Sequence, residues 1–310
     1  MVTGEFSRFE HSVVGILYML FGVVGVISNL MVILTFLREK SLLKSSKAWL
    51  HISLALSNIG VVGPSPFPAS SAFSGKWLYG ETGCQLYAFE GMMMGIAAIG
   101  NVIALCVERY LVSTRKEAME TNSGGFYWLS TAAVWLNAFF WAIMPVLGWS
   151  KYVHEPTGSS CAINWRDADE GYPSYMIMLC IFSFGFPLAI AISCLWASGE
   201  SSTIQQAPPS SASSSQVDAF TGFREDQLKW LCYSHLLFTV IGWGPFAFLC
   251  LWALFSAPVQ VSMIAACIPP LACKSMVLMY PFSYIVANER FRNSFFSVLS
   301  LTGSTVPKKD

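Results

Sequence analysis

Residues 11–36 read HSVVGILYMLFGVVGVISNLMVILTF, and this stretch decides the fold. It contains no Asp, Glu, Lys or Arg. A helix needs about 20 mostly apolar residues to cross the ~30 Å hydrocarbon core of a membrane. No basic region precedes the stretch and no small-residue cleavage site follows it, so we expect a retained membrane-spanning helix rather than a signal peptide.

Further apolar stretches of similar length follow along the chain. They lie at about residues 48–73, 84–110, 127–148, 172–196, 228–255 and 259–287. The Pro and Gly residues inside several of them do not exclude helices, because neighbouring helices can satisfy the freed backbone groups. The sequence therefore predicts an all-α membrane protein, a bundle of seven transmembrane helices.

The overall composition agrees with a membrane protein. Charged residues make up 12% of the chain, where a soluble protein carries roughly 25%. Hydrophobic residues make up 54%, and the mean hydropathy is +0.54. The 18 Lys and Arg residues balance the 18 Asp and Glu residues, which gives no basic surface for a nucleic acid. These values exclude a disordered chain, a nucleic-acid-binding protein and an ordinary soluble enzyme.

Basic residues between the predicted spans gather on one side of the membrane. That side carries Arg38, Lys40, Lys44, Lys47, Arg115, Lys116, Arg224, Lys229, Arg290, Arg292, Lys308 and Lys309. The other side carries only Arg8, Lys76, Lys151 and Arg166. Because Lys and Arg are enriched in cytoplasmic loops, the N-terminus is predicted outside and the C-terminus in the cytoplasm.

The predicted organisation has four parts. We expect an extracellular N-terminus at 1–11, the spanning domain at 12–287, an amphipathic helix at 288–300 and a cytoplasmic tail at 301–310. The amphipathic helix places Phe291, Phe295, Phe296 and Leu299 on one face, which is typical of a helix lying on a membrane surface.

The third cytoplasmic loop is predicted at about residues 197–226, where the chain becomes rich in Ser and Pro. The fifth span is expected to stop soon after Trp196, which leaves no basic cytoplasmic extension of that helix.

Two of the nine cysteines differ from the other seven, which lie inside the apolar spans. Cys84 opens the third span, and Cys161 lies in the loop between the fourth and fifth spans. Both are predicted to face an oxidising compartment, which favours a disulfide over two free thiols. The sequence predicts no metal site.

Lys274 is a charged residue near the middle of the seventh span, and such residues are usually functional. It sits too deep for its stem to reach either interface. It could form an ion pair within the bundle. Alternatively, a buried lysine loses its proton readily and can condense with an aldehyde to give a Schiff base.

Several motifs resemble those of rhodopsin-like G-protein-coupled receptors. Glu108-Arg109-Tyr110 resembles their Glu/Asp-Arg-Tyr triplet, and Tyr280-Pro281-Phe282-Ser283-Tyr284 is similar to their Asn-Pro-x-x-Tyr motif. Lys274 lies six residues before Tyr280, the spacing of the retinal-carrying lysine in opsins. The chain is identified by this resemblance as a member of the opsins.

The resemblance is greatest to the peropsins and the photoisomerase-type opsins, with neuropsins as neighbours. It is carried by LGWSKYVHEPTGSSCAINWR at 147–166, SLALSNIG at 53–60, IVANERFR at 285–292 and Trp243-Gly244-Pro245.

The resemblance implies a retinal chromophore, in the 11-cis or all-trans form, attached to Lys274. Glu155 matches the position of the loop counterion of non-visual opsins, and Glu90 is the other candidate. Tyr87 stands where vertebrate visual opsins have a Glu. The implied pocket residues are Tyr87, Gly95, Trp165, Phe184, Trp243 and Phe246. For each pocket residue taken alone, ordinary core packing explains the residue type equally well.

The resemblance also implies light-driven signalling from the plasma membrane to a heterotrimeric G protein. Arg109 is then expected to pair with Glu108 and Glu225, while Tyr110, Pro281 and Tyr284 belong to the switch. Two departures put coupling in doubt, since Tyr280 replaces an Asn and Leu195 replaces a Tyr. A retinal photoisomerase with weak coupling is therefore an alternative. A receptor for a diffusible ligand is a third. Retinal, a G protein and membrane lipid are the expected partners, without nucleic acid.

Overall fold

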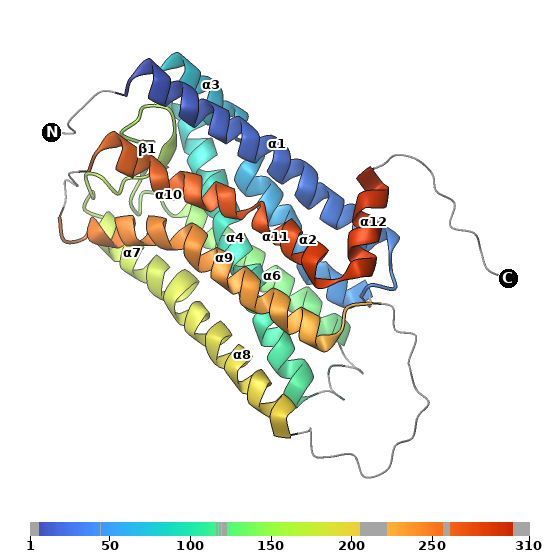
Figure 1. The fold of residues 1–310 in the computed structure, drawn as a ribbon. Coiled ribbons are helices and arrows are strands. Elements are labelled where there is room, and N and C mark those ends of the chain that lie inside the picture. The colour runs from blue at the N-terminus through green and yellow to red at the C-terminus, as the bar shows by residue number, and fades with distance from the viewer. Residues whose placement is uncertain are drawn as a thin grey trace, which may run out of the picture.

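The computed structural model is a bundle of long helices (Figure 1). It describes residues 6–43, 45–115, 117, 119, 123–204, 222–256 and 261–299. Within these residues, six helical segments are long and apolar enough to cross a membrane. They are Arg8–Arg38, Gly80–Thr114, Gly124–Ile143, Tyr172–Gly199, Glu225–Trp252 and Met263–Ala287. Each coincides with one of the seven predicted spans.

The remaining predicted span is divided into two helices, α2 (Ser45–Val62) and α3 (Pro66–Ser74). Pro64 has no backbone N–H, so it cannot continue the hydrogen-bond ladder of α2. The N–H of Ser65 instead bonds the carbonyl of Val62 at 3.1 Å, which makes a tight turn. Gly22 of α1 (Arg8–Arg38) packs against this turn, where a Cβ on the glycine would lie only 2.8 Å from Cβ of Ser65.

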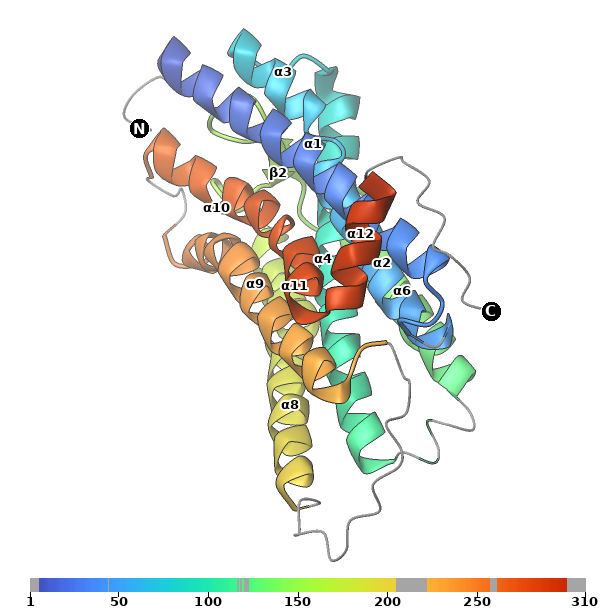
Figure 2. The same cartoon turned by 45° about the vertical axis from the view of Figure 1, so that its right-hand side comes forward.

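The third span, α4 (Gly80–Thr114), has contacts with α2, α6 (Ser123–Ile143), α8 (Phe186–Ile204) and α9 (Glu225–Trp252). The fifth span comprises α7 (Tyr172–Leu179), the π-helical segment η1 (Cys180–Gly185) and α8. The seventh comprises α10 (Met263–Met276) and α11 (Met279–Ala287). Figure 2 shows α8 at the outside of the bundle.

The membrane-spanning part of the fifth span ends at Gly199, soon after Trp196, whereas the helix α8 continues to Ile204. Side chains of α9 hydrogen-bond to its carbonyls. Lys229 Nζ donates to Ser198 at 2.7 Å, and Tyr233 Oη donates to Leu195 at 3.2 Å. These hydrogen bonds between α8 and α9 stabilise the end of α8, where the Ser-rich sequence does not itself favour a helix. The rest of the predicted loop, residues 205–221, lies outside the described residues.

Large apolar side chains are exposed along the outer faces of the helices. Examples are Ile16 and Leu20 on α1, Trp128 and Leu136 on α6, and Phe186 on α8. A soluble protein rarely exposes apolar patches of this extent. The outer surface therefore suits contact with lipid, as the sequence predicts.

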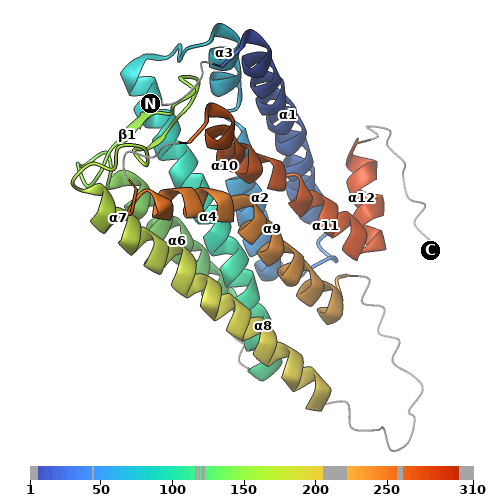
Figure 3. The same cartoon turned by 60° about the vertical axis from the view of Figure 1, so that its left-hand side comes forward.

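A short hairpin covers the end of the bundle that the charge distribution predicts to be extracellular (Figure 3). Its strands, β1 (Tyr152–His154) and β2 (Cys161–Ile163), are antiparallel, with His154 opposite Cys161. The predicted disulfide is confirmed: Cys161 is bonded to Cys84 at the start of α4. The hairpin is thus fixed over the interior of the bundle.

The opposite end, called the cytoplasmic end below, carries α12 (Glu289–Leu299) (Figure 1). Phe291 and Phe295 are buried in a hydrophobic cluster with residues of α1 and α11, whereas Phe296 is exposed. Part of the predicted apolar face of this helix is therefore covered by the bundle and not by lipid. The side chain of Leu299 lies outside the described residues.

Candidate functional site

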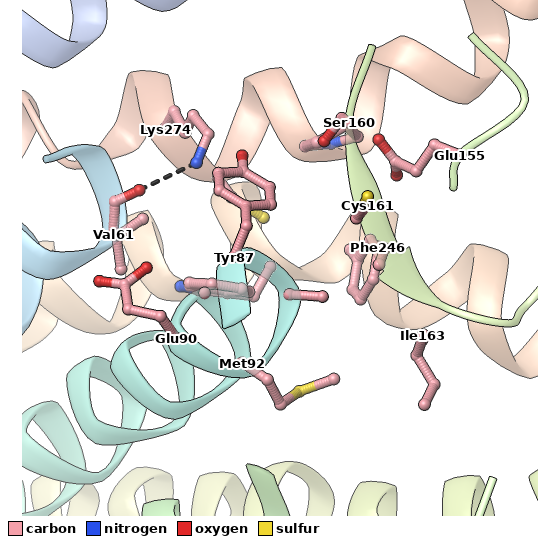
Figure 4. A pocket seen from close by; sticks show the side chains of 16 residues that line it. Val61, Tyr87, Glu90, Met92, Glu155, Ser160, Cys161, Ile163, Phe246 and Lys274 are labelled. Carbon is pink, nitrogen blue, oxygen red and sulfur yellow. Dashed lines mark hydrogen bonds between the residues drawn. The ribbon is translucent and has the colours of Figure 1, made fainter. Parts of the chain in front are cut away.

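Lys274 lies in the last turn of α10 and is only 8% exposed. Its Nζ donates a hydrogen bond of 2.9 Å to the carbonyl oxygen of Val61 in α2 (Figure 4). In an uninterrupted helix the N–H of Ser65 would donate a hydrogen bond to that carbonyl. Because Ser65 bonds Val62 at the Pro64 bend, the oxygen of Val61 is free to accept the amine. The bend in the second span thus provides the acceptor for Lys274.

Two aromatic rings lie near the same amine. The Nζ atom of Lys274 is 5.8 Å from the ring centroid of Tyr18 and 5.8 Å from that of Tyr87. An ammonium group at such distances is attracted by the ring faces. Sequence reasoning included Tyr87 but missed Tyr18, the only tyrosine of α1 and only 2% exposed. A polar hydroxyl in an aliphatic span was the signal that could have found it.

The two candidate counterions, Glu90 of α4 and Glu155 after β1, line the cavity that contains Lys274. In the view of Figure 4 they lie on opposite sides of the Tyr87 ring. None of the salt bridges within the described part of the chain involves Lys274. The charge of Lys274 acts on both carboxylates without direct contact.

Glu155 is buried beneath the hairpin, although it lies outside the spanning helices. Burial raises the pKa of its carboxyl to about 7, against the smaller lowering effects of a hydrogen bond from Ser160 and of the charge on Lys274. The carboxyl is therefore poised to change its protonation near neutral pH.

The cavity beside Lys274 is adjoined by a second, apolar cavity. Met92, Trp243 and Phe246 line both. The second cavity is completed by Ile96, Ile99, Met176, Leu179, Cys180, Ser183, Phe184, Ala247 and Cys250. Together they form a mostly apolar space beside a buried amine.

The π-helical segment η1 supplies Cys180, Ser183 and Phe184 to the second cavity. A π-helix inserts an extra residue into an α-helix and is frequent at functional sites. Gly95 lies against Trp243, so close that a Cβ on the glycine would overlap the indole ring. The glycine therefore lets the edge of the indole approach α4 closely, and Trp243 lines both cavities from this position.

Two predicted pocket residues are not among those that line the two cavities. Gly95 instead lies against Trp243, and Trp165 lies beneath the hairpin. Trp165 follows β2 and is buried in the hydrophobic cluster there, with Tyr152 and Tyr172. In this structure its indole therefore packs into the core under the loop, and a role in the pocket stays a prediction.

At the cytoplasmic end, Arg109 forms ion pairs with both predicted partners. It pairs with the adjacent Glu108, and its Nη1 lies 2.6 Å from Oε2 of Glu225. Tyr127 Oη donates to the other oxygen of Glu108 at 2.6 Å. The carbonyl of Tyr110, the third residue of the triplet, accepts hydrogen bonds from Ser113 and Thr114.

The two tyrosines of the motif at residues 280–284 also have buried partners. Tyr280 Oη lies 3.0 Å from Oγ1 of Thr239, and Tyr284 Oη lies 2.7 Å from Nδ1 of His51. Pro281 is buried inside α11. These contacts connect α11 to α9 and α2 between the two ends of the bundle.

Comparison with known proteins places this geometry in context. The chain matches the family described as 7 transmembrane receptor (rhodopsin family) over residues 28–287. It is 31% identical over 294 residues to the visual pigment-like receptor peropsin of Mus musculus. That match covers 94% of this chain and 86% of the relative. It is 31% identical over 310 residues to retinochrome of Todarodes pacificus, with 99% and 95% covered.

The fold is similar to that in the crystal structure of squid rhodopsin. The TM-score is 0.83 at 23% sequence identity, and the match covers 96% of this chain and 87% of that one. At this identity the likeness shows the fold alone. It confirms the predicted seven-helix bundle and makes the protein an integral multi-pass membrane protein. The chain belongs to the rhodopsin family of seven-transmembrane receptors, with non-visual opsins among its relatives.

Proposed function

We propose that this protein is a retinal-binding photoreceptor that carries its chromophore on Lys274. The observation that carries the proposal is the buried amine beside a mostly apolar space. The amine suits an aldehyde, and the two adjoining cavities suit a long apolar chain. When bound, retinal supplies the absorption of light and the change of shape.

The residues around Lys274 have separate roles in this proposal. Condensation of the amine with an aldehyde forms a carbon–nitrogen double bond and releases one water. The product is a buried cation when protonated, and it needs nearby negative charge. Glu155 and Glu90 supply that charge, and the rings of Tyr18 and Tyr87 face the same nitrogen.

Signalling to a heterotrimeric G protein is the proposed output. It is supported by the ion pairs of Arg109, which hold the cytoplasmic ends of α4 and α9 together. A change of chromophore shape against Trp243 and Phe246, both on α9, would bias the bundle towards an arrangement without those pairs. The plasma membrane is the proposed location.

A retinal photoisomerase with weak coupling is the second candidate. Tyr87, a neutral side chain, stands at the counterion position of vertebrate visual opsins and lines the cavity. The similarity to retinochrome and, at 26% identity over 295 residues, to the RPE-retinal G protein-coupled receptor of Homo sapiens supports this candidate.

The decisive experiment is pigment formation. The purified full chain is mixed with 11-cis- or all-trans-retinal, and absorbance is recorded before and after light. Borohydride reduction and peptide mass spectrometry then locate the adduct. We expect a pigment in the wild type and in Lys151→Ala, an exposed-lysine control, but none in Lys274→Ala. Failure with both isomers would overturn both candidates.

If pigment forms, two measurements separate the candidates. A photoreceptor accelerates nucleotide exchange on a G protein after illumination. A photoisomerase instead releases a different retinal isomer in each light cycle, as chromatography of extracted retinal shows, with little nucleotide exchange.

A further inference from the structure

Tyr18 of α1 has contacts with two parts of the site that belong to different elements. Its ring centroid lies 5.8 Å from Nζ of Lys274 in α10. Its hydroxyl is hydrogen-bonded to the side chain of Ser160, the residue before the disulfide-bonded Cys161. One buried side chain thus faces the amine with its ring and the hairpin with its hydroxyl.

Ser160 continues this contact to Glu155. The two residues face each other across the turn of the hairpin, where the N–H of Glu155 donates to the carbonyl of Ser160 at 2.8 Å. Their side chains are also hydrogen-bonded to each other, and Figure 4 shows both on the hairpin side of the cavity. Both side chains are buried, so bulk water does not readily replace these bonds.

The chemistry of the three groups fixes the direction of the bonds. An ionised carboxylate only accepts hydrogen bonds, so the hydroxyl of Ser160 donates to Glu155. The oxygen of Ser160 then accepts the proton of the Tyr18 hydroxyl. We call Tyr18, Ser160 and Glu155 the hydroxyl chain. Each donor in such a chain polarises the next, which strengthens the bond that reaches the charged group.

We propose that Tyr18 is a positioning residue for Glu155: its hydroxyl holds Ser160 in the orientation that keeps the acid ionised beside the imine on Lys274. This inference rests on the proposed function, since that imine is the adduct of the lysine with retinal. The hydroxyl chain itself is present in the ligand-free protein, so its effect on Glu155 is measurable without retinal.

Other titratable groups also face Glu155. Within the described residues they are Tyr18 of α1, Cys250 of α9, and Cys267, Cys273 and Lys274 of α10. Burial raises the pKa of Glu155, and only the hydrogen bond from Ser160 and the charge of Lys274 oppose that effect. Because the hydrogen bond favours the ionised form, its loss moves the pKa of Glu155 upward.

Two variants interrupt the hydroxyl chain at different points. Tyr18→Phe keeps the ring near the amine and removes the hydroxyl. Ser160→Ala removes the donor to Glu155. Tyr152→Phe is the matched control, because Tyr152 is a buried tyrosine of the same hairpin whose hydroxyl donates to the carbonyl of Ala142 at 2.8 Å.

The first test is an infrared pH titration of the full chain in lipid nanodiscs without retinal. The carboxyl band of Glu155 is identified by its absence in Glu155→Gln. We expect its midpoint to rise by at least about 0.5 pH unit in Tyr18→Phe and about 1 pH unit in Ser160→Ala, with no change in Tyr152→Phe.

The double variant Tyr18→Phe/Ser160→Ala separates a chain from two independent effects. Its midpoint should equal that of Ser160→Ala alone, because the tyrosine acts only through the serine. The proposal is overturned by an unchanged midpoint in Tyr18→Phe, or by a double variant that shifts by the sum of the two single shifts.

The second test is the absorbance titration of the pigment. Tyr18→Phe should move the transition to a lower pH by at least about 0.5 unit, in the same direction as Glu155→Gln, while Tyr152→Phe leaves it unchanged. A purely structural defect lowers the yield of pigment but does not move the transition. A transition that moves in Glu155→Gln but not in Tyr18→Phe overturns the proposal.

Two further outcomes are distinguishable. If Glu155→Gln leaves the transition in place, Glu155 is not the counterion, and the proposed role of Tyr18 at the imine is wrong as well. If the wild type forms no pigment, the proposed function is contradicted instead, and the infrared titration still decides whether Tyr18 acts on Glu155.

Discussion

The amine of Lys274 is bonded to the carbonyl oxygen of Val61 and not to a carboxylate. That carbonyl is available because Pro64 interrupts α2 one turn later. The buried amine therefore has a neutral acceptor, two ring faces and two more distant acids around it. An amine in these surroundings has a partner in the ligand-free protein and keeps access to the cavity.

The first prediction concerns the size of the site. Gly95→Ala places a methyl group against the ring of Trp243, which has to shift into the cavities. We expect a loss of stability of about 1–3 kcal/mol and a lower yield of pigment. Gly91→Ala is the matched control, since Gly91 lies on the same helix and lines the cavity beside Lys274, but its Cβ would meet nothing within 4 Å. Retinal titrations of the two variants measure the difference, and equal yields would contradict the packing argument.

The second prediction concerns the counterion. Glu155→Gln and Glu90→Gln each remove one of the two acids that line the cavity with Lys274. The variant that lacks the principal counterion should move the pH of the pigment's absorbance transition to a lower value, because the cation loses its stabilising charge. Absorbance titration of both variants and the wild type ranks the two acids. If neither variant moves the transition, both assignments fail.

The third prediction is a pH dependence of stability. The pKa of the Glu155 carboxyl is raised from 4.5 to about 7 in the folded protein. Between these values the folded state binds more protons than the unfolded state, so stability falls as pH rises. The loss is complete above about pH 7 and amounts to at most about 3 kcal/mol.

Thermal unfolding of the retinal-free protein between pH 4.5 and 8 tests this. The wild type should lose melting temperature across that range, while Glu155→Gln should show a flatter profile. Parallel profiles for the two proteins would mean that the carboxyl titrates at its ordinary value.

The helices follow from the sequence because runs of about 20 apolar residues have few alternatives in a membrane. The positions at which helices divide or end were harder to predict from the sequence. Prolines are visible in both the second and the seventh span. The bend at Pro64 divides the second span into two helices, whereas Pro269 and Pro270 lie within the continuous helix α10. The end of α8 depends on hydrogen bonds from Lys229 and Tyr233, which are tertiary and leave no local pattern.

The candidate site likewise contains some residues that could be predicted from the sequence and others that could not. Lys274 was visible as a charge inside an apolar span, and Cys84 and Cys161 as the two cysteines on the predicted outer side. Val61 could not be predicted from the sequence, because it acts through its backbone carbonyl oxygen, which every residue has. The bond between Tyr18 and Ser160 was hidden for another reason, since two residues so far apart in the sequence give no sign that they will meet.

The last prediction concerns Tyr127, which sequence reasoning did not single out. Its hydroxyl donates to Glu108 at 2.6 Å, and the same carboxylate pairs with Arg109. All three side chains are buried. A hydrogen bond to a buried charged group contributes about 1.5–3 kcal/mol, and its loss leaves a carboxylate oxygen without a donor. Tyr127→Phe should therefore destabilise the protein by about that amount.

Detergent-mediated unfolding in mixed micelles measures the change. Tyr79→Phe is the control, because the Tyr79 hydroxyl also has a hydrogen-bond partner, Ser70, but lies in an exposed position. Water can replace that lost bond, so the control should change stability by less than about 0.5 kcal/mol. If Tyr127→Phe is equally mild, Glu108 has enough stabilisation from Arg109 alone, and the tyrosine is not needed to support the ion pair at the cytoplasmic end.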